Sequence, residues 1–239
     1  MYKRQRERTT ILHGIDLELN AGECLGIIGE SGSGKSTLGR VLCGLLAPDS
    51  GRVLMNNVGL YARRTAQEDA RIRNKISIVF QDYTTSVNPR FRVHSILHES
   101  FRALRRAGEN ISSEQEYRRC CELLERVGLN AEFMTRYPHE LSGGQLQRAC
   151  ICRSMMNRPK LLFADEPTGA LNRTSSNEVM DELVKLNNEG TTIVMVTHDA
   201  KVAAKCGRVL FIVDGNIKGE YTGLKEITCL LYTSPSPRD

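Results

Sequence analysis

Short apolar runs alternate with longer amphipathic stretches along this chain, and a glycine or polar turn follows most of the runs. Five runs have the length expected of buried parallel strands: residues 24–28, 76–80, 161–164, 191–196 and 209–213. Alternating apolar and polar residues over 11–19 predict a half-buried strand near the N-terminus. A further short strand is predicted over 52–55, and a hairpin turn at 214–215.

Helical patterns fill the intervals between these runs. Residues 93–157 have helical periodicity throughout, and the spacing of Ser113 and Glu116 predicts a capping box. Individual helices are predicted over residues 35–46, 117–127, 145–156 and 175–186. Strand–helix alternation on both sides of a helical block indicates an α/β fold with a parallel sheet and a helical insertion.

Residues 29–36 read Gly-Glu-Ser-Gly-Ser-Gly-Lys-Ser, the pattern of a phosphate-binding loop between a strand and a helix. Its glycines let the backbone wrap closely around phosphates, and its backbone N–H groups attract anions. Lys35 would supply positive charge to the β- and γ-phosphates, and the Ser36 hydroxyl would bind Mg²⁺. The predicted cradle comprises Gly29, Glu30, Ser31, Gly32, Ser33, Gly34, Lys35, Ser36 and Thr37.

Two adjacent carboxylates, Asp165 and Glu166, follow the apolar run 161–164. This position corresponds to the carboxyl edge of a sheet, where α/β proteins place ligands. Asp165 is predicted to hold Mg²⁺ directly or through water, and Glu166 to act as general base toward the attacking water. A nucleotide and Mg²⁺ are therefore expected to bind here, and the resemblance described below implies that the nucleotide is ATP.

A second setting for an anion lies at the start of the helix near residue 145. Ser142, Gly143 and Gly144 would offer free N–H groups, a hydroxyl and the positive end of the helix dipole. The chain already has one phosphate cradle, so two such sites make sense for one ATP if they lie on different copies. A dimer with two-fold symmetry would then hold two equivalent ATP molecules.

Residues 141–145 read Leu-Ser-Gly-Gly-Gln, between the phosphate loop and the carboxylates. With these elements the chain resembles the ATP-binding cassette, the motor subunit of ABC transporters. The resemblance implies a P-loop (RecA-like), mostly parallel core with an N-terminal antiparallel β part and an inserted helical subdomain. We expect the core to comprise residues 6–87 and 158–228, and the helical subdomain residues 88–157.

The resemblance also implies roles for further residues and partners. Gln81 would reach Mg²⁺ and the attacking water, and His198 would contact the γ-phosphate. Ser142, Gly143, Gly144 and Gln145 would bind the ATP held by a second cassette in a head-to-tail dimer. The family further implies transmembrane permease subunits as partners, a peripheral position at the cytoplasmic face of the membrane, and no nucleic acid.

The subfamily signal is mixed. Residues 79–90 and 137–148 resemble the peptide and nickel importers, whereas residues 164–171 and 191–198 are more similar to the lipoprotein and macrolide exporters. We expect import of peptide or nickel, with such an exporter as the alternative. A soluble cassette of DNA repair or chromosome organisation fits less well, because residues 37–140 contain neither a long coiled coil nor a zinc module.

Two features depart from the family pattern, and the ends of the chain suggest a reason for one of them. Asn172 stands where the family usually has aspartate, which keeps hydrogen-bonding capacity but removes the charge. The aromatic residue that stacks on adenine is expected near Arg6, where none is found. Residues 1–5 and 229–239 resemble a translated sequencing adapter, so we expect the natural insert to comprise residues 6–228 and to lack its adenine platform.

Composition narrows the class of protein further. Apolar residues make up 40% of the chain, yet no apolar run approaches the roughly 18–20 residues that span a bilayer, so no direct membrane insertion is expected. The net charge is +5, of which +2 lies in the adapter-like ends; the remaining +3 does not indicate nucleic-acid binding. The cysteine spacings match no zinc site, and buried reduced thiols are expected.

Overall fold

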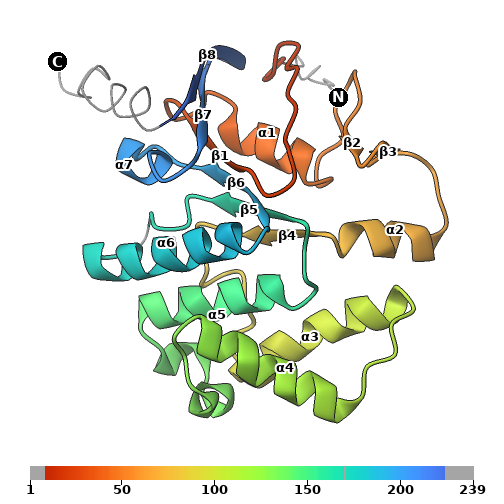
Figure 1. Ribbon diagram of the computed structural model, residues 1–239, viewed down its shortest axis with the longest axis vertical. Helices are drawn as coiled ribbons and strands as arrows, with labels where there is room; N and C mark the ends of the chain where they lie inside the picture. The colour runs from red at the N-terminus through yellow and green to blue at the C-terminus, as the bar shows by residue number, and fades with distance from the viewer. Residues whose placement is uncertain (1–8, 170, 224–239) are drawn as a thin grey trace, which may run out of the picture.

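A six-stranded sheet forms the centre of the fold (Figure 1), with the strand order β4–β5–β6–β1–β7–β8. The structure is a computed structural model that describes residues 9–169 and 171–223. The five parallel strands are β1 (Cys24–Ile28), β4 (Ile76–Val79), β5 (Leu161–Asp165), β6 (Thr192–Val196) and β7 (Arg208–Val213). The sixth strand, β8 (Asn216–Thr222), pairs antiparallel with β7 across the predicted turn at 214–215. The five predicted parallel strands are confirmed to within one residue at each end.

The two faces of the sheet bury different helices, because successive side chains of a strand point to opposite faces. On one face, Leu25 and Ile27 of β1 pack with Leu38 of α1 (Lys35–Leu42). On the other face, the apolar side chains pack with α5 (Gly143–Met155), α6 (Arg173–Asn188) and α7 (Ala200–Ala203). This two-sided cover explains why the parallel strands are apolar along their whole length.

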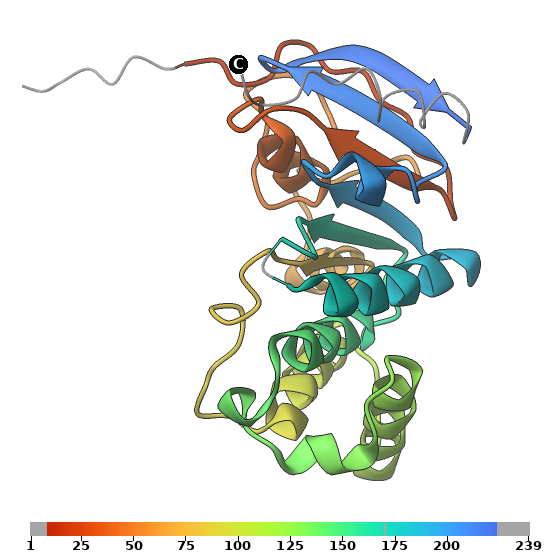
Figure 2. The same cartoon turned by 90° about the vertical axis from the view of Figure 1, so that its left-hand side faces the viewer.

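The helical insertion lies on the side of the sheet away from β8 (Figures 1 and 2). It contains α3 (Val93–Arg106), α4 (Ser113–Arg126) and the short 3₁₀ turns η1 (Ala131–Thr135) and η2 (Pro138–Glu140). Contacts of α5 with β4 and α6 join this part to the core. The inserted helical subdomain is confirmed, whereas its boundaries at residues 88 and 157 stay predictions.

The predicted strand over residues 11–19 is not present. Side chains such as Ile15, Leu17 and Leu19 are half-buried against the α1 face of the core, so the alternation in burial is real. The backbone forms no ladder with another strand there. The His13 N–H donates to the Gly215 carbonyl at 2.9 Å, and the backbone carbonyl of Glu18 accepts from the Arg208 guanidinium at 2.7 Å. Period-two burial indicates an extended segment, but it does not ensure a partner strand.

The antiparallel part following α1 differs in extent from its prediction. Helix α1 ends at Leu42 rather than Leu46, because Gly44 adopts a left-handed conformation (φ +75°) that ends the helix. Only β2 (Leu54–Met55) forms from the predicted 52–55 strand, and it pairs with β3 (Val58–Gly59) across a tight turn. Helix α2 (Ala66–Arg73) follows and had no counterpart among the predicted elements.

The capping box of α4 is displaced by one residue from the predicted pair. The Ser112 hydroxyl accepts from the Gln115 N–H at 3.3 Å, and the Ser112 N–H donates to Gln115 Oε1 at 2.9 Å. Glu116 instead turns inward, is only 3% exposed, and binds His98 Nε2 at 2.7 Å and the Arg105 guanidinium. The glutamate therefore joins α3 to α4 rather than capping a helix.

The structure also bears on the state of the cysteines, on metal-binding clusters and on membrane-spanning helices. The cysteines there are free, and five of them are buried. Within 9–169 and 171–223, no group of three His, Cys, Asp or Glu side chains could hold a metal ion. The same ranges contain no helix long and apolar enough to cross a membrane. The adapter-like segments 1–5 and 229–239 lie outside the described residues.

Candidate functional site

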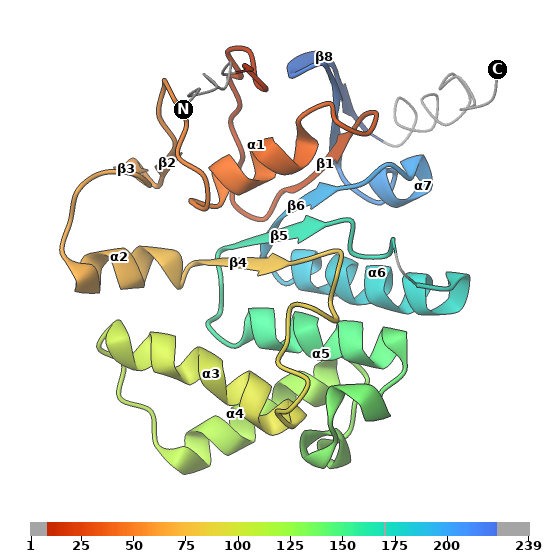
Figure 3. The same ribbon diagram turned by 180° about the vertical axis from the view of Figure 1, so that it is seen from behind.

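Four neighbouring parallel strands end at one edge of the sheet, and each is followed by predicted site residues. The sequence continues from β1 into Gly29, from β4 into Gln81, from β5 into Glu166 and from β6 into His198. In Figure 3 the arrows of β4, β5 and β6 point to this common edge. Parallel pairing therefore gathers residues that are up to 169 positions apart in the sequence.

One side of the phosphate loop packs closely against β7, and its other side is open to solvent. A Cβ at Gly29 would lie 2.1 Å from the Ile212 carbonyl oxygen of β7, so only glycine fits there. Gly34 adopts φ +99° at the start of α1, a conformation that glycine takes without strain. Glu30, Ser31 and Gly32 are exposed to solvent, and Thr37 is half-buried on the first turn of α1.

Lys35 is 6% exposed, and its ammonium group donates to the Gly29 carbonyl at 2.8 Å and the Glu30 carbonyl at 2.6 Å. Burial lowers the pKa of Lys35, and the nearby Glu166 and Asp165 carboxylates oppose that change. The ammonium group of Lys35 is thus held against the backbone of the loop. Anions bound by the loop would be attracted to it.

Asp165 and Ser36 meet although they come from different elements. The Ser36 hydroxyl donates to Asp165 Oδ1 at 3.0 Å. Burial raises the pKa of Asp165, while the Ser36 hydrogen bond and the positive charges of Arg40 and Lys35 partly offset that rise. The pair presents a hydroxyl and a carboxylate oxygen side by side, which are ligands that Mg²⁺ prefers.

Glu166 occupies an unusual backbone conformation for a non-glycine residue, with φ +45°. Its N–H donates to the Val196 carbonyl at 2.8 Å, which ties the turn after β5 to β6. His198 Nδ1 lies 3.0 Å from Glu166 Oε1. A Cβ at Gly169 would lie 3.3 Å from both Gln81 Nε2 and Glu166 Oε2. Gln81 and Glu166 therefore both lie beside Gly169, and His198 contacts the other carboxylate oxygen of Glu166.

The residues present fit a nucleotide triphosphate and its Mg²⁺. The Ser33 hydroxyl, 4% exposed, has no hydrogen-bond partner among the described residues and belongs to the loop. Buried polar atoms without partners are uncommon and indicate a missing ligand or water. Ser36, Asp165 and Gln81 supply only oxygen ligands for a hard cation.

The Ser142 segment forms a separate part of the predicted site. Ser142 and Gln145 cap α5 for each other: the Ser142 hydroxyl accepts from the Gln145 N–H at 3.3 Å. A Cβ at Gly143 would lie 2.6 Å from the Tyr83 hydroxyl, and one at Gly144 would lie 2.6 Å from the Ser175 hydroxyl. Within the described ranges, no hydrogen bond links residues 142–145 to the phosphate loop.

Comparison with known sequences decides the family. A profile described as ABC transporter matches residues 12–169. The chain is 38% identical over 227 residues to the uncharacterized ABC transporter ATP-binding protein YknY of Bacillus subtilis (strain 168), which covers 95% of both proteins. This chain belongs to the ABC transporter ATP-binding family. It is an ATPase, as sequence analysis predicted.

Two further relatives extend the comparison. The cassette is 35% identical to the nickel import ATP-binding protein NikE of Shigella boydii serotype 4 (strain Sb227), over 90% of this chain and 80% of that protein. Its fold is similar to that of the ATP-binding cassette MJ0796, solved as a dimer in a post-hydrolysis state bound to ADP and Pi. That match has a TM-score of 0.80 and 33% identity, covering 92% of this chain and 94% of that one.

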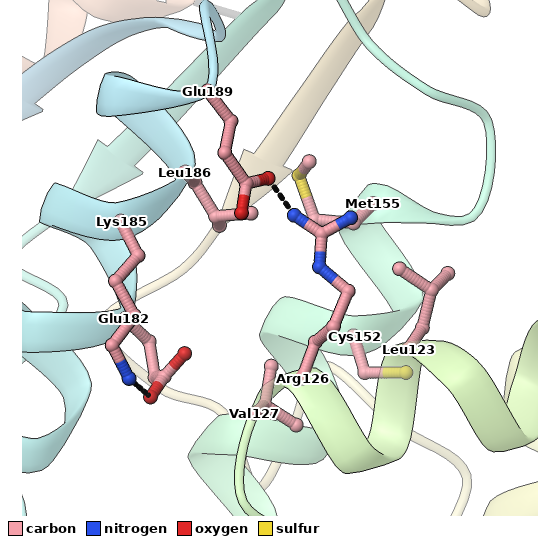
Figure 4. Close-up of a pocket in the computed structure, with 9 residues that line it drawn as sticks. All are labelled: Leu123, Arg126, Val127, Cys152, Met155, Glu182, Lys185, Leu186 and Glu189. Atoms are coloured by element: carbon pink, nitrogen blue, oxygen red, sulfur yellow. Dashed lines mark hydrogen bonds and ion pairs between the residues drawn. The ribbon is translucent and has the colours of Figure 1, made fainter.

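The cassette also has a crevice of about 240 Å³ among α4, α5 and α6 (Figure 4). Leu123, Val127 and Met155 form part of its apolar lining, while the ion pairs Arg126–Glu189 and Lys185–Glu182 lie beside it. Its volume is below the roughly 300–1,000 Å³ of most ligand pockets. None of the predicted site residues lines it.

Two residues close to Glu166 were not among the predicted site residues. Gly169 lies against Gln81 and Glu166, and its lack of a side chain makes room for both. Gln147 is fully buried on α5 and hydrogen-bonds to the backbone beside Glu166. Its position five residues after Ser142 on a helix was visible in the sequence. Its inward orientation was not, because a glutamine is usually exposed.

Proposed function

We propose that this cassette drives substrate translocation by ATP-dependent head-to-tail dimerisation with a second cassette, and that transmembrane permease subunits are its partners. The observation that carries the chemistry is the position of Glu166, which lies beside Gln81 at Gly169, 3.0 Å from His198, and close enough to Lys35 to interact with its charge. That arrangement combines a cation for phosphates with a carboxylate base, and both belong to one edge of the sheet.

The loop and its lysine bind the triphosphate. Backbone N–H groups of residues 30–36 and the start of α1 face the phosphates, and Ser33 supplies a further hydroxyl. Lys35 exchanges its hydrogen bonds with the Gly29 and Glu30 carbonyls for bonds to the β- and γ-phosphates. Ser36, Asp165 and Gln81 would hold Mg²⁺, which neutralises negative charge on the phosphate oxygens when bound.

Glu166 is the proposed general base. Its carboxylate accepts a proton from the attacking water, which forms the new bond to the γ-phosphorus as the bond to the β–γ bridging oxygen breaks. Gln81 orients the water through its amide. His198, 3.0 Å from Glu166, fixes the carboxylate and reaches toward the γ-phosphate.

Ser142, Gly143, Gly144 and Gln145 complete the site of the opposite cassette. The first turn of α5 offers N–H groups and a hydroxyl, and its dipole favours an anion. Support for the dimer comes from the relative MJ0796, which was solved in dimeric form with ADP and Pi. In this proposal bound ATP joins the two copies, and hydrolysis releases them.

The Glu166→Gln variant tests the assignment of the base. We expect steady-state ATP turnover to fall by about 100-fold or more, since general-base catalysis contributes roughly 10²–10⁴-fold. ATP binding should persist, because the phosphate loop is unchanged. The readouts are phosphate release and fluorescent-nucleotide titration, with Lys35→Ala as the variant that loses binding. Full turnover in Glu166→Gln would remove Glu166 from this role.

The proposed cargo is nickel or a peptide, moved inward. The similarity to the nickel import protein NikE and the importer-like residues 79–90 support this direction. The exporter-like residues 164–171 and 191–198 favour a lipoprotein or macrolide exporter as the second candidate. Mass spectrometry of the membrane proteins that co-purify with the chain from its native cells tests the choice. Exporter subunits in place of importer permeases would reverse it.

A further inference from the structure

One buried polar side chain of α5 has no part in the proposed mechanism. Gln147 lies on α5 and is 0% exposed. Its Nε2 donates to the Pro167 carbonyl oxygen at 2.9 Å, and this bond is buried. Its Oε1 has no hydrogen-bond partner among the described residues. Burying an amide with one end unpaired is unfavourable, so stability alone does not explain a glutamine here.

The bond ends on the segment that carries the proposed base. Pro167 directly follows Glu166, whose φ of +45° is strained for a residue with a side chain. Such conformations persist only where the surroundings hold them. Pro167 itself has no N–H, so its carbonyl is the one backbone group by which this residue can be held.

Few other hydrogen bonds hold the backbone of residues 166–169. The Glu166 N–H donates to Val196 at 2.8 Å, and the Gly169 N–H donates to the Glu166 carbonyl at 3.1 Å. Among the hydrogen bonds of the described ranges, that of Gln147 is the only one from a side chain to the backbone of residues 166–169. It also comes from α5, whereas the other two involve β6 and the turn itself.

We propose that Gln147 is a positioning residue for ATP hydrolysis: its amide holds the Pro167 carbonyl and thereby keeps the Glu166 carboxylate within reach of His198 and the attacking water. The proposal rests on the assignment of Glu166 as general base. It makes a buried hydrogen bond between α5 and the β5–α6 turn a determinant of turnover. Displacement of a catalytic group by about 1 Å can lower a rate by about 100-fold.

The first experiment is the variant Gln147→Met, which keeps an unbranched side chain of similar length and removes the donor. We expect kcat for ATP to fall by about 10–100-fold while KM for ATP and nucleotide affinity change by less than about two-fold. The thermal unfolding midpoint should change little, because the unpaired Oε1 is removed together with the hydrogen bond. Gln147→Leu repeats the test with a second apolar shape.

The matched control is Ile151→Val, one helical turn further along α5. Ile151 is 0% exposed and forms no bond to the β5–α6 turn. This variant should lose stability through its missing methyl group and keep wild-type kcat. A kcat loss in Ile151→Val as large as that in Gln147→Met would overturn the proposal, because general loosening of α5 would then explain both.

A double-variant cycle separates this inference from the assignment of Glu166. If Gln147 acts through Glu166, adding Gln147→Met to Glu166→Gln lowers the residual single-turnover rate by less than about two-fold. Independent, multiplicative losses would overturn the positioning role. Wild-type kcat in Gln147→Met, with turnover lost in Glu166→Gln, would overturn this inference and leave the proposed function intact. Full turnover in Glu166→Gln would instead remove the base itself.

Discussion

The carboxyl group of Asp165 lies where burial disfavours its charge. Burial raises the pKa of Asp165, and the Ser36 hydroxyl and neighbouring cations offset that only in part. Because the folded chain binds this proton more tightly than the unfolded chain does, the contribution of Asp165 to stability is largest at low pH. It is lost as pH rises through the folded pKa, so at neutral pH the ionised group is a destabilising one.

Asp165→Asn should therefore raise the thermal unfolding midpoint of the nucleotide-free protein at pH 7 while lowering Mg²⁺-dependent ATP turnover by about 100-fold or more. The gain in midpoint should shrink as pH falls toward the folded pKa, where wild-type Asp165 becomes neutral. Scanning calorimetry of both proteins at several pH values measures this difference in unfolding midpoint. A lower midpoint in Asp165→Asn at pH 7 would show that the ionised carboxylate stabilises the fold.

Individual site residues could be predicted where their chemistry is local. Lys35 and Ser36 follow three glycines, and Asp165 and Glu166 follow an apolar run, so neighbouring residues indicate their positions. Gln147 could not be predicted in the same way. Its burial depends on where α5 lies against the β5–α6 turn, and this is a tertiary contact without a local pattern.

At the scale of elements, α1 and β5 are fitted to each other at one glycine. A Cβ at Gly39 would lie 2.0 Å from Cζ of Phe163, a ring that is 1% exposed. Glycine within a helix is ordinarily unfavourable, by about 1 kcal/mol relative to alanine. Here it allows the helix that begins in the phosphate loop to approach the strand that ends at Asp165.

Gly39→Ala should destabilise the protein by about 1–3 kcal/mol, since the added methyl overpacks the α1–β5 contact and outweighs the better helix propensity. The measurement is equilibrium unfolding in urea. Asn177→Ala, at an exposed position of α6, is the control and should stay within about 0.5 kcal/mol of wild type. Phe163→Leu in the Gly39→Ala background should restore part of the loss; no recovery would place the strain elsewhere.

Elements were predicted well where both faces of the sheet are covered, and less well near its edges. Strand β6, buried at every position, differs by one residue from its predicted range. The 11–19 segment has the burial pattern of a strand but pairs with no strand, because a ladder depends on neighbours that periodicity does not specify. The predicted capping box was wrong by one residue because both Ser112 and Ser113 are followed three residues later by Gln or Glu.

For the whole molecule, alternation of strands and helices predicted the parallel core and its helical insertion. The strand order β4–β5–β6–β1–β7–β8 was not predicted, since sequence patterns do not say which strands are neighbours. That order decides which loops share an edge. It explains how Gln81, Glu166 and His198 meet although three different strands deliver them.

Dimerisation is the prediction that belongs to the whole molecule. Glu166→Gln saturated with Mg²⁺ and ATP should have twice the mass of the nucleotide-free protein by light scattering. Adding Ser142→Arg, which places bulk at the start of α5, should return the protein to monomers and leave nucleotide binding by the phosphate loop unchanged. Monomers at saturating nucleotide in Glu166→Gln alone would contradict the head-to-tail arrangement.

The placement of Gln147 on α5 has a consequence for the timing of the two active sites. Five residues separate Ser142 from Gln147, or about 7.5 Å of one rigid helix. In the proposed dimer, the first residues of this helix contact the nucleotide of the opposite copy, and Gln147, one turn further on, holds the catalytic turn of its own copy. Binding of nucleotide at one site of the dimer would then affect the position of Glu166 in the other, so hydrolysis at the two sites would be correlated rather than independent.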